Sequence, residues 1–282
     1  TEVSGRSHRI ESAPMSDDVL EGLRASWGQR HLGTRPRSTA VAHEERPGEV
    51  SQTGSAGVLF HGDYSAVTTA GEEFGQSRLG IGVMHDLDGE IVSINGTAWC
   101  IPVDGRPREL DPDEGIAFGI AAHGGVGHVV SIATGSSMEQ ILIAVDMYLE
   151  STHVNHEQVV CAIEIVGTFT DVILRTEAPP TYEHEPLGEV LERETRFEFD
   201  SWDGTLVGFR FPDLTDGEII PGLHLHAMGS DLLSGGHVRR VATSTVAATV
   251  WIDELHPLVG TKGTAESNGP DIDFDKYEGP LA

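Results

Sequence analysis

The chain has 282 residues, of which 45 are Asp or Glu and only 18 are Lys or Arg, so its formal net charge at pH 7 is -27. Nucleic acids and anionic membranes carry the same sign of charge, and the sequence therefore speaks against both as partners. A hydrophobic content of 38% supports one large or two small domains, and 34 glycines with 6% aromatic residues favour short strands joined by turns.

Residues 1 to 50 are rich in Ser, Arg, Glu and Pro, which predicts a mobile N-terminal extension. Within it, the spacing of apolar residues between 19 and 27 predicts one short helix, with Ser16 before it as a possible N-terminal cap. The folded part is expected to begin at residues 57–60. Apolar runs bounded by turn dipeptides such as Asn95-Gly96 then predict strands at residues 79–84, 91–94, 97–101, 116–121, 159–166 and 171–175.

One longer segment, residues 137–149, has its apolar side chains at the spacing of a single helix face. We expect this helix to pack on the first sheet. Ala178-Pro179-Pro180 then interrupts the chain and places a domain boundary there. A second set of strands is predicted at residues 197–199, 205–211, 223–226, 238–241 and 246–252.

These elements predict an α+β protein with two β-rich domains, built from mixed sheets with few helices and with the active site between them. The expected divisions are the extension at 1–50, an N-terminal α+β domain at 51–178 and a C-terminal β-rich domain at 179–282.

Three further features bear on the environment in which the protein works. Lys262 and Lys276 are the only lysines, and an acidic surplus of this kind favours adaptation to concentrated salt, with an ordinary acidic protein as the alternative. Cys100 and Cys161 are isolated, so no disulfide framework is indicated. The sequence contains no 18-residue apolar run and no recognisable signal peptide, which predicts a cytoplasmic protein with no membrane segment.

The densest chemical signal is a group of three histidines. His224 and His226 are two residues apart in a predicted strand, so both side chains point to the same face. His237 follows Gly235-Gly236, where a hairpin would return it beside the pair. Three neutral imidazoles suit a catalytic zinc ion, because they leave its fourth position open. From their spacing alone, the three histidines could instead be ordinary polar residues of a half-solvated strand that bind no metal.

Several separated motifs resemble the α-acetolactate decarboxylases, which convert 2-acetolactate to acetoin and carbon dioxide. Residues 221–226 (PGLHLH) followed by 235–238 (GGHV) resemble the zinc-binding stretch of that family. Residues 80–90 (GIGVMHDLDGE), 167–176 (GTFTDVILRT) and 204–212 (GTLVGFRFP) resemble three other segments of it. Order and approximate spacing agree from about Gly57 onward, with two departures: Val83 stands where the family has Thr, and the region before Glu278 differs from the family's pattern.

The resemblance implies a small-molecule substrate, 2-acetolactate, and Zn²⁺ as cofactor. It places the zinc ligands on His224, His226 and His237 in the C-terminal domain, and the active-site arginine on Arg175. It places two glutamates on Glu90 and on Glu278, the second in a tail that returns to the site.

Loss of CO2 leaves an enediolate, which zinc and Arg175 would stabilise and a glutamic acid would protonate. Glu90 and Glu278 remain the two candidates for the proton donor.

Two alternatives stay open. A non-catalytic descendant would keep the metal to stabilise its fold, or would bind a small hydroxy acid. A cupin-like iron oxygenase also carries an HxH pair, but it has a Glu about four residues later, where this chain has Gly229, Ser230 and Asp231. A homodimer is compatible with the sequence, which does not fix the oligomeric state.

Overall fold

The computed structural model describes residues 50–155, 159–212 and 222–254. The strands are β1 (Val50–Thr53), β2 (Thr68–Thr69), β3 (Leu79–Met84), β4 (Glu90–Ile94), β5 (Thr97–Ile101), β6 (Arg108–Glu109), β7 (Gly115–Ala122), β8 (His128–Val130), β9 (Val159–Thr176), β10 (Thr195–Phe211), β11 (Gly222–Gly229) and β12 (Gly235–Glu254). The helices are α2 (Ala56–Phe60), α3 (Ala70–Phe74), α4 (Met138–Ser151) and α5 (Leu187–Val190), with the 3-10 turns η1 (His85–Leu87) and η2 (Leu191–Arg193).

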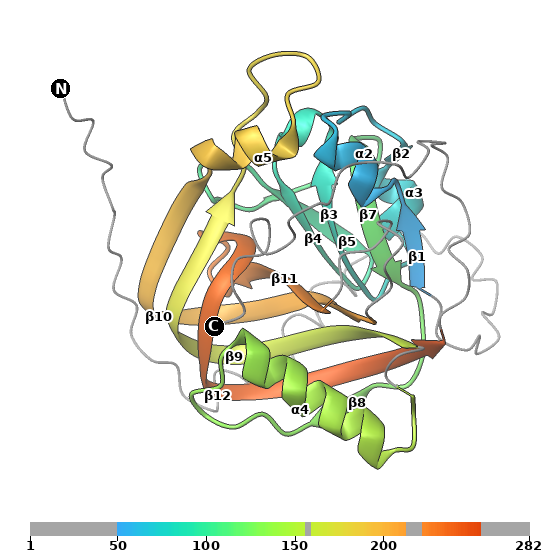
Figure 1. Cartoon of the computed structure of the whole chain (residues 1–282), viewed down its shortest axis with the longest axis vertical. Coiled ribbons are helices and arrows are strands. Elements are labelled where there is room, and N and C mark those ends of the chain that lie inside the picture. The colour runs from blue at the N-terminus through green and yellow to red at the C-terminus, as the bar shows by residue number, and fades with distance from the viewer. Residues whose placement is uncertain (1–49, 156–158, 213–221, 255–282) are drawn as a thin grey trace, which may run out of the picture.

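The first sheet has the strand order β1-β7-β3-β4-β5-β6, with β2 paired to β7. Its central strand β3 is buried at every position, which explains why its sequence, LGIGVM, is continuously apolar rather than alternating. The second sheet has the order β11-β10-β9-β12-β8, and β11 also pairs with β12. The four long strands β9 to β12 therefore form a closed ring of pairings (Figure 1).

Curvature allows β12 to close this ring. Its register against β9 shifts at three places between Val238 and Thr245. Bulges of this kind bend a strand and increase its twist. As a result, the start of β12 pairs with β9 and also with β11, where His226 lies opposite His237, whereas its later part pairs with β9 and β8.

The β-rich α+β class predicted from the sequence is confirmed. All strand pairs in the described residues are antiparallel, which corrects the expectation of mixed sheets. The folded part of the chain begins earlier in the sequence than expected, because β1 starts at Val50 and residues 57–60 lie within α2. The strands expected at 159–166 and 171–175 are one strand, β9.

The helix expected at residues 137–149 is α4, but it packs on the second sheet and not on the first. Its buried side chains Met138, Ile141, Val145 and Leu149 belong to the same core as β9, β10, β11 and β12. Figure 1 shows α4 against the side of the second sheet that faces away from the first. Ser137 caps the helix through a capping box with Gln140, the pattern that stabilises a helix start.

The second sheet also takes in strands that precede Ala178. Both β8 and β9 belong to it, so the chain passes from one sheet to the other between Ala122 and His128. The division into domains at residue 178 stays a prediction. The short helix expected near residues 19–27 lies outside the described residues.

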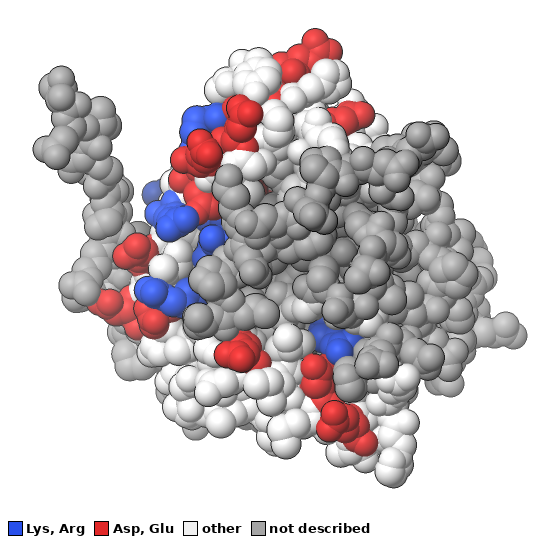
Figure 2. Space-filling model, in the orientation of Figure 1, with Lys and Arg blue, Asp and Glu red and all other residues white. Residues whose placement is uncertain are grey.

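The described surface carries ion pairs despite the acidic composition. Figure 2 shows acidic and basic side chains side by side over β10 and the segment that carries α5. Pairs in these segments include Arg193 with Glu185 and Arg196 with Glu194. Among the described residues, no helix is both long and apolar enough to cross a membrane.

Candidate active site

The closed ring of strands brings the three histidines together. His226 on β11 lies opposite His237 on β12, and His237 lies opposite Arg175 on β9. His224, two residues before His226, points to the same side of β11. The three imidazoles have exposed fractions of 5%, 2% and 0% in chain order, and their ligand nitrogens lie within 4.8 Å of one another.

The geometry of this cluster fits one metal ion. The Nδ1 of His226 donates a hydrogen bond to the Ile91 carbonyl oxygen at 2.8 Å, because that oxygen can only accept. Its Nε2 therefore faces the cluster as a ligand atom, an arrangement common among metal-binding histidines. The Nε2 atoms of His224 and His226 are 3.2 Å apart. Two nitrogens bound to one tetrahedral zinc ion lie about 3.3–3.4 Å apart, so the pair has nearly the required spacing.

His237 is held in the neutral form that a metal requires. Burial, followed by the positive charge of Arg175 and the neighbouring His226, places the pKa of His237 well below 6.5. A neutral imidazole keeps a lone pair for coordination, whereas a protonated one does not.

Glu90 and Arg175 reach the cluster from opposite sheets. Glu90 begins β4 in the first sheet, where it is 2% exposed, and its Oε2 lies 3.4 Å from the Nε2 of His226. Its Oε1 lies 3.9 Å from both the Nδ1 of His237 and the Nη1 of Arg175. Arg175, near the end of β9, is fully buried. The expected residues Glu90, Arg175, His224, His226 and His237 thus meet at one place between the sheets.

Two further carboxylates at this place were not predicted from the sequence. Glu177 is 2% exposed and forms an ion pair with the Nη1 of Arg175. Glu194 lies 3.6 Å from the Nε of Arg175 and also pairs with Arg196. Glu177 follows Arg175 by two positions, the spacing that puts extended side chains on one face, and this was the only sequence signal for it.

Two glycines allow strands to approach closely around the ligands. A Cβ added at Gly208 on β10 would lie 1.9 Å from the carbonyl oxygen of His224. At Gly236, a Cβ would lie 2.4 Å from the carbonyl oxygen of Arg175, and the backbone φ there is +138°. Only glycine fits these places without a shift of the strand that carries a site residue.

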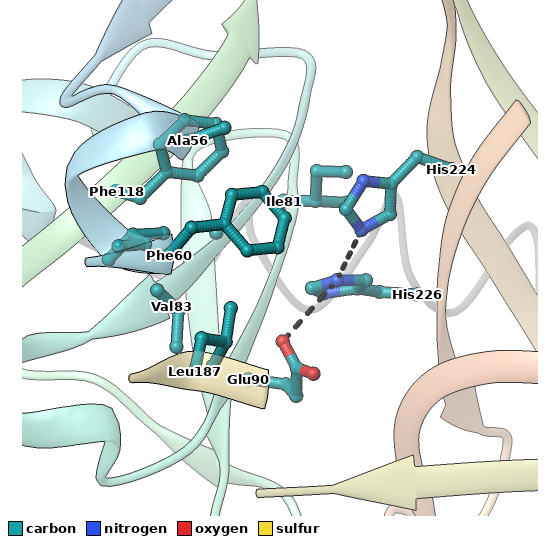
Figure 3. Close-up of a pocket in the computed structure, with 11 residues that line it drawn as sticks. Ala56, Phe60, Ile81, Val83, Glu90, Phe118, Leu187, His224 and His226 are labelled. Atoms are coloured by element: carbon teal, nitrogen blue, oxygen red, sulfur yellow. Dashed lines mark hydrogen bonds and ion pairs between the residues drawn. The ribbon is translucent and has the colours of Figure 1, made fainter. Parts of the chain in front are cut away.

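A pocket opens beside the cluster. It has an empty volume of about 380 Å³, part of it open to solvent, and lies between α2, the first sheet, α5 and β11. Its lining is Ala56, Leu59, Phe60, Ile81, Gly82, Val83, Glu90, Phe118, Leu187, His224 and His226. Figure 3 shows the aromatic rings of Phe60 and Phe118 on one side, and Glu90 with the two histidines on the other.

Sequence comparison places the chain among known enzymes. The sequence profile of alpha-acetolactate decarboxylase matches residues 50–258. The alpha-acetolactate decarboxylase of Methylococcus capsulatus is 32% identical over 198 residues, covering 70% of this chain and 74% of that protein. The corresponding protein of Brevibacillus brevis is 28% identical over 200 residues, covering 71% and 68%.

The chain belongs to the α-acetolactate decarboxylase family.

The fold agrees with this assignment. The crystal structure of alpha-acetolactate decarboxylase from Bacillus subtilis strain 168 matches with a TM-score of 0.70 and 24% sequence identity, covering 82% of this chain and 99% of that one.

Within this α-acetolactate decarboxylase fold, Val83 lines the pocket at the position where the resemblance places a Thr. Glu278 lies outside the described residues, so its role as a second active-site glutamate stays a prediction.

Proposed function

We propose that this protein decarboxylates 2-acetolactate to acetoin, using the buried group formed by Glu90, Arg175 and the three histidines. One observation carries the proposal: these five side chains come from both sheets and meet at one buried place, where Glu90, His224 and His226 also line an apolar pocket. A carboxyl group, a permanent cation and an open metal site are the parts that loss of CO2 from a β-keto acid needs.

Arg175 is proposed to hold the anionic end of the substrate. Its guanidinium is always charged and can grip a carboxylate or an enediolate oxygen with two N–H groups. When the bond to the carboxylate carbon breaks, its electron pair stays on the substrate as an enediolate, and the carboxylate leaves as neutral CO2. Arg175 would remain near the developing negative charge, where a buried, fixed cation acts strongly.

Glu90 is proposed to deliver the proton that ends the reaction. It is the carboxyl group that lines the pocket next to His226, and a proton from it would pass to the enediolate carbon to give acetoin. Glu278 remains the second candidate for this role. The apolar walls, including Phe60 and Phe118, would keep water away from the enediolate until that step.

His224, His226 and His237 are the residues that would hold a metal ion, for which we propose zinc. A zinc ion bound there supplies a Lewis acid for the oxygens of the ketone and the tertiary hydroxyl group. The preference for zinc over iron rests on the three histidines of the metal-binding group, whereas iron oxygenases of the facial type use two histidines and a carboxylate as ligands.

The test is whether zinc-loaded protein releases acetoin. Purified protein would be stripped with a chelator, reloaded with zinc and mixed with 2-acetolactate, and the acetoin formed would be measured. Folded, loaded protein that binds the substrate but yields no acetoin would support a non-catalytic binding protein instead. Iron as the metal present on isolation, together with oxygen consumption, would support the oxygenase.

A further inference from the structure

Glu177 occupies a place in the site that neither the family motifs nor the pocket lining identifies. It follows the last residue of β9, is almost completely buried and pairs with the Nη1 of Arg175. The Oε1 of Glu90 lies 3.9 Å from the same Nη1. Glu177 and Glu90 thus meet at one nitrogen of Arg175, but Glu177 does not line the pocket itself.

Glu177 adds negative charge beside the Arg175 guanidinium. Three carboxyl groups lie near this one guanidinium: Glu177 on Nη1, Glu90 at 3.9 Å and Glu194 at 3.6 Å from Nε. Glu194 is shared with the exposed Arg196, whereas the ion pair of Glu177 with Arg175 lies inside the site. Much of the positive charge of Arg175 is therefore balanced before a substrate enters.

The reaction makes this balance useful. The substrate enters as a carboxylate, and its negative charge moves to the enediolate oxygen as neutral CO2 leaves. A buried guanidinium without a partner would bind the incoming anion strongly, because attraction between charges grows in a low-dielectric pocket. Tight binding of the ground state does not accelerate the chemical step and raises the barrier from the bound complex.

We propose that Glu177 is a positioning residue, an inference that rests on the proposed function. Glu177 fixes the Arg175 guanidinium beside Glu90, and its negative charge weakens the binding of the anionic substrate. The ionised form that this role needs is favoured here. Burial acts to raise the pKa of Glu177, but the Arg175 charge, with hydrogen bonds from Glu90 and from the backbone, holds it below the usual value.

The experiment compares zinc-loaded wild type with Glu177→Gln, which keeps the size of the side chain and removes its charge. We expect kcat to fall by about tenfold or more while KM stays level or decreases. Binding of 2-hydroxy-2-methylpropanoate, an anion with the carboxylate and tertiary hydroxyl of the substrate but no ketone, would be measured by calorimetry. Its Kd should fall by about threefold or more, while the Kd of neutral acetoin stays within about twofold.

Further variants separate this role from a structural one. Glu177→Asp keeps the charge on a shorter side chain and should have a kcat between those of wild type and Glu177→Gln. Glu73→Gln removes another buried carboxyl group, which accepts hydrogen bonds from Ser51 and Thr53 and does not line the pocket, and should leave kcat and KM within about twofold of wild type.

A raised KM, weaker binding of the anion or an unchanged kcat in Glu177→Gln would overturn the inference while leaving the decarboxylase activity of wild type in place. Absence of acetoin from wild type would instead reject the proposed function. Should Glu177→Gln fail to fold, Glu177→Asp decides: a lower kcat without a higher KM supports the role, and wild-type kinetics reject it.

Discussion

Arg175 shows how strongly this site depends on single residues. It is the largest of the fully buried side chains in the described part of the chain. Burying a guanidinium is costly unless carboxylates surround it, and here Glu90, Glu177 and Glu194 do so. These partners come from β4, from the end of β9 and from the turn before β10, so the pairing of the two sheets is a condition for a stable site.

Removal of a histidine from the cluster should remove the metal. His224→Ala and His237→Ala each leave two of the three protein ligands. Because two nitrogens bind zinc weakly, we expect bound zinc to fall from about one per chain to less than about 0.2 after dialysis. Elemental analysis of purified protein measures this. His85→Ala, which changes an exposed histidine outside the cluster, is the control, and equal zinc in all variants would refute the ligand assignment.

A methyl group at Gly236 should disturb the site through the backbone. In Gly236→Ala, an unfavourable φ combines with a contact of 2.4 Å to the carbonyl of Arg175. We expect a loss of about 2–4 kcal/mol in the free energy of unfolding, from strain and overpacking together. Urea denaturation would measure it. Gly135→Ala, at φ +82° with nothing within 4 Å, isolates strain alone and should lose only about 1 kcal/mol. Equal losses would contradict the crowding argument.

For helices and strands, the sequence predicted where most elements lie along the chain, but it was less successful at predicting which elements pack together. Strands β3, β4, β5 and β7 lie where apolar runs between turn dipeptides placed them. The short edge strand β1 was missed, because VSQT carries no alternation that marks a strand. The helix α4 was predicted but assigned to the wrong sheet, since its periodicity shows which face is buried but not what covers that face.

The packing of α4 on the second sheet can be measured by a matched pair of substitutions. Ile141 is fully buried against that sheet, whereas Ile143 on the same helix is 48% exposed. Ile141→Ala should lower the free energy of unfolding by about 2–5 kcal/mol, the cost of a large core cavity. Ile143→Ala should change it by less than about 0.5 kcal/mol. Similar losses in the two variants, followed by chemical denaturation, would argue against this interface.

Only the residues of the candidate site that belong to recognisable sequence motifs could be predicted. The histidine pair followed from alternation in a strand, and His237 from a hairpin, whereas Glu90 and Arg175 were placed by family resemblance. Glu177 and Glu194 had no comparable signal, because isolated acidic residues are common in a chain with 45 of them. The pairing of β9 with β10 brings Glu194 to Arg175, and only the structure shows that Glu177, two residues after Arg175, is buried against it.

At the scale of the whole molecule, the net charge of -27 should make stability depend on salt. Repulsion among exposed carboxylates extends over about 10 Å at 0.1 M salt and about 3 Å at 1 M. Between 0.1 and 2 M KCl we expect the thermal midpoint to rise by at least about 5 °C, since 1 kcal/mol corresponds to about 2–4 °C in a chain of this size. Calorimetry would show the rise. A midpoint that is flat or falls with KCl would reject salt adaptation.

The fold brings a carboxyl group from the first sheet to a histidine cluster on the second, and we propose that this junction decarboxylates 2-acetolactate when metal is bound. The most direct measurement is the rate of acetoin release while zinc is titrated into metal-free protein. The rate should rise in proportion to zinc and level off at about one ion per chain, the capacity of a single three-histidine site. No acetoin at full zinc occupancy, or the same rate with and without zinc, would contradict the account.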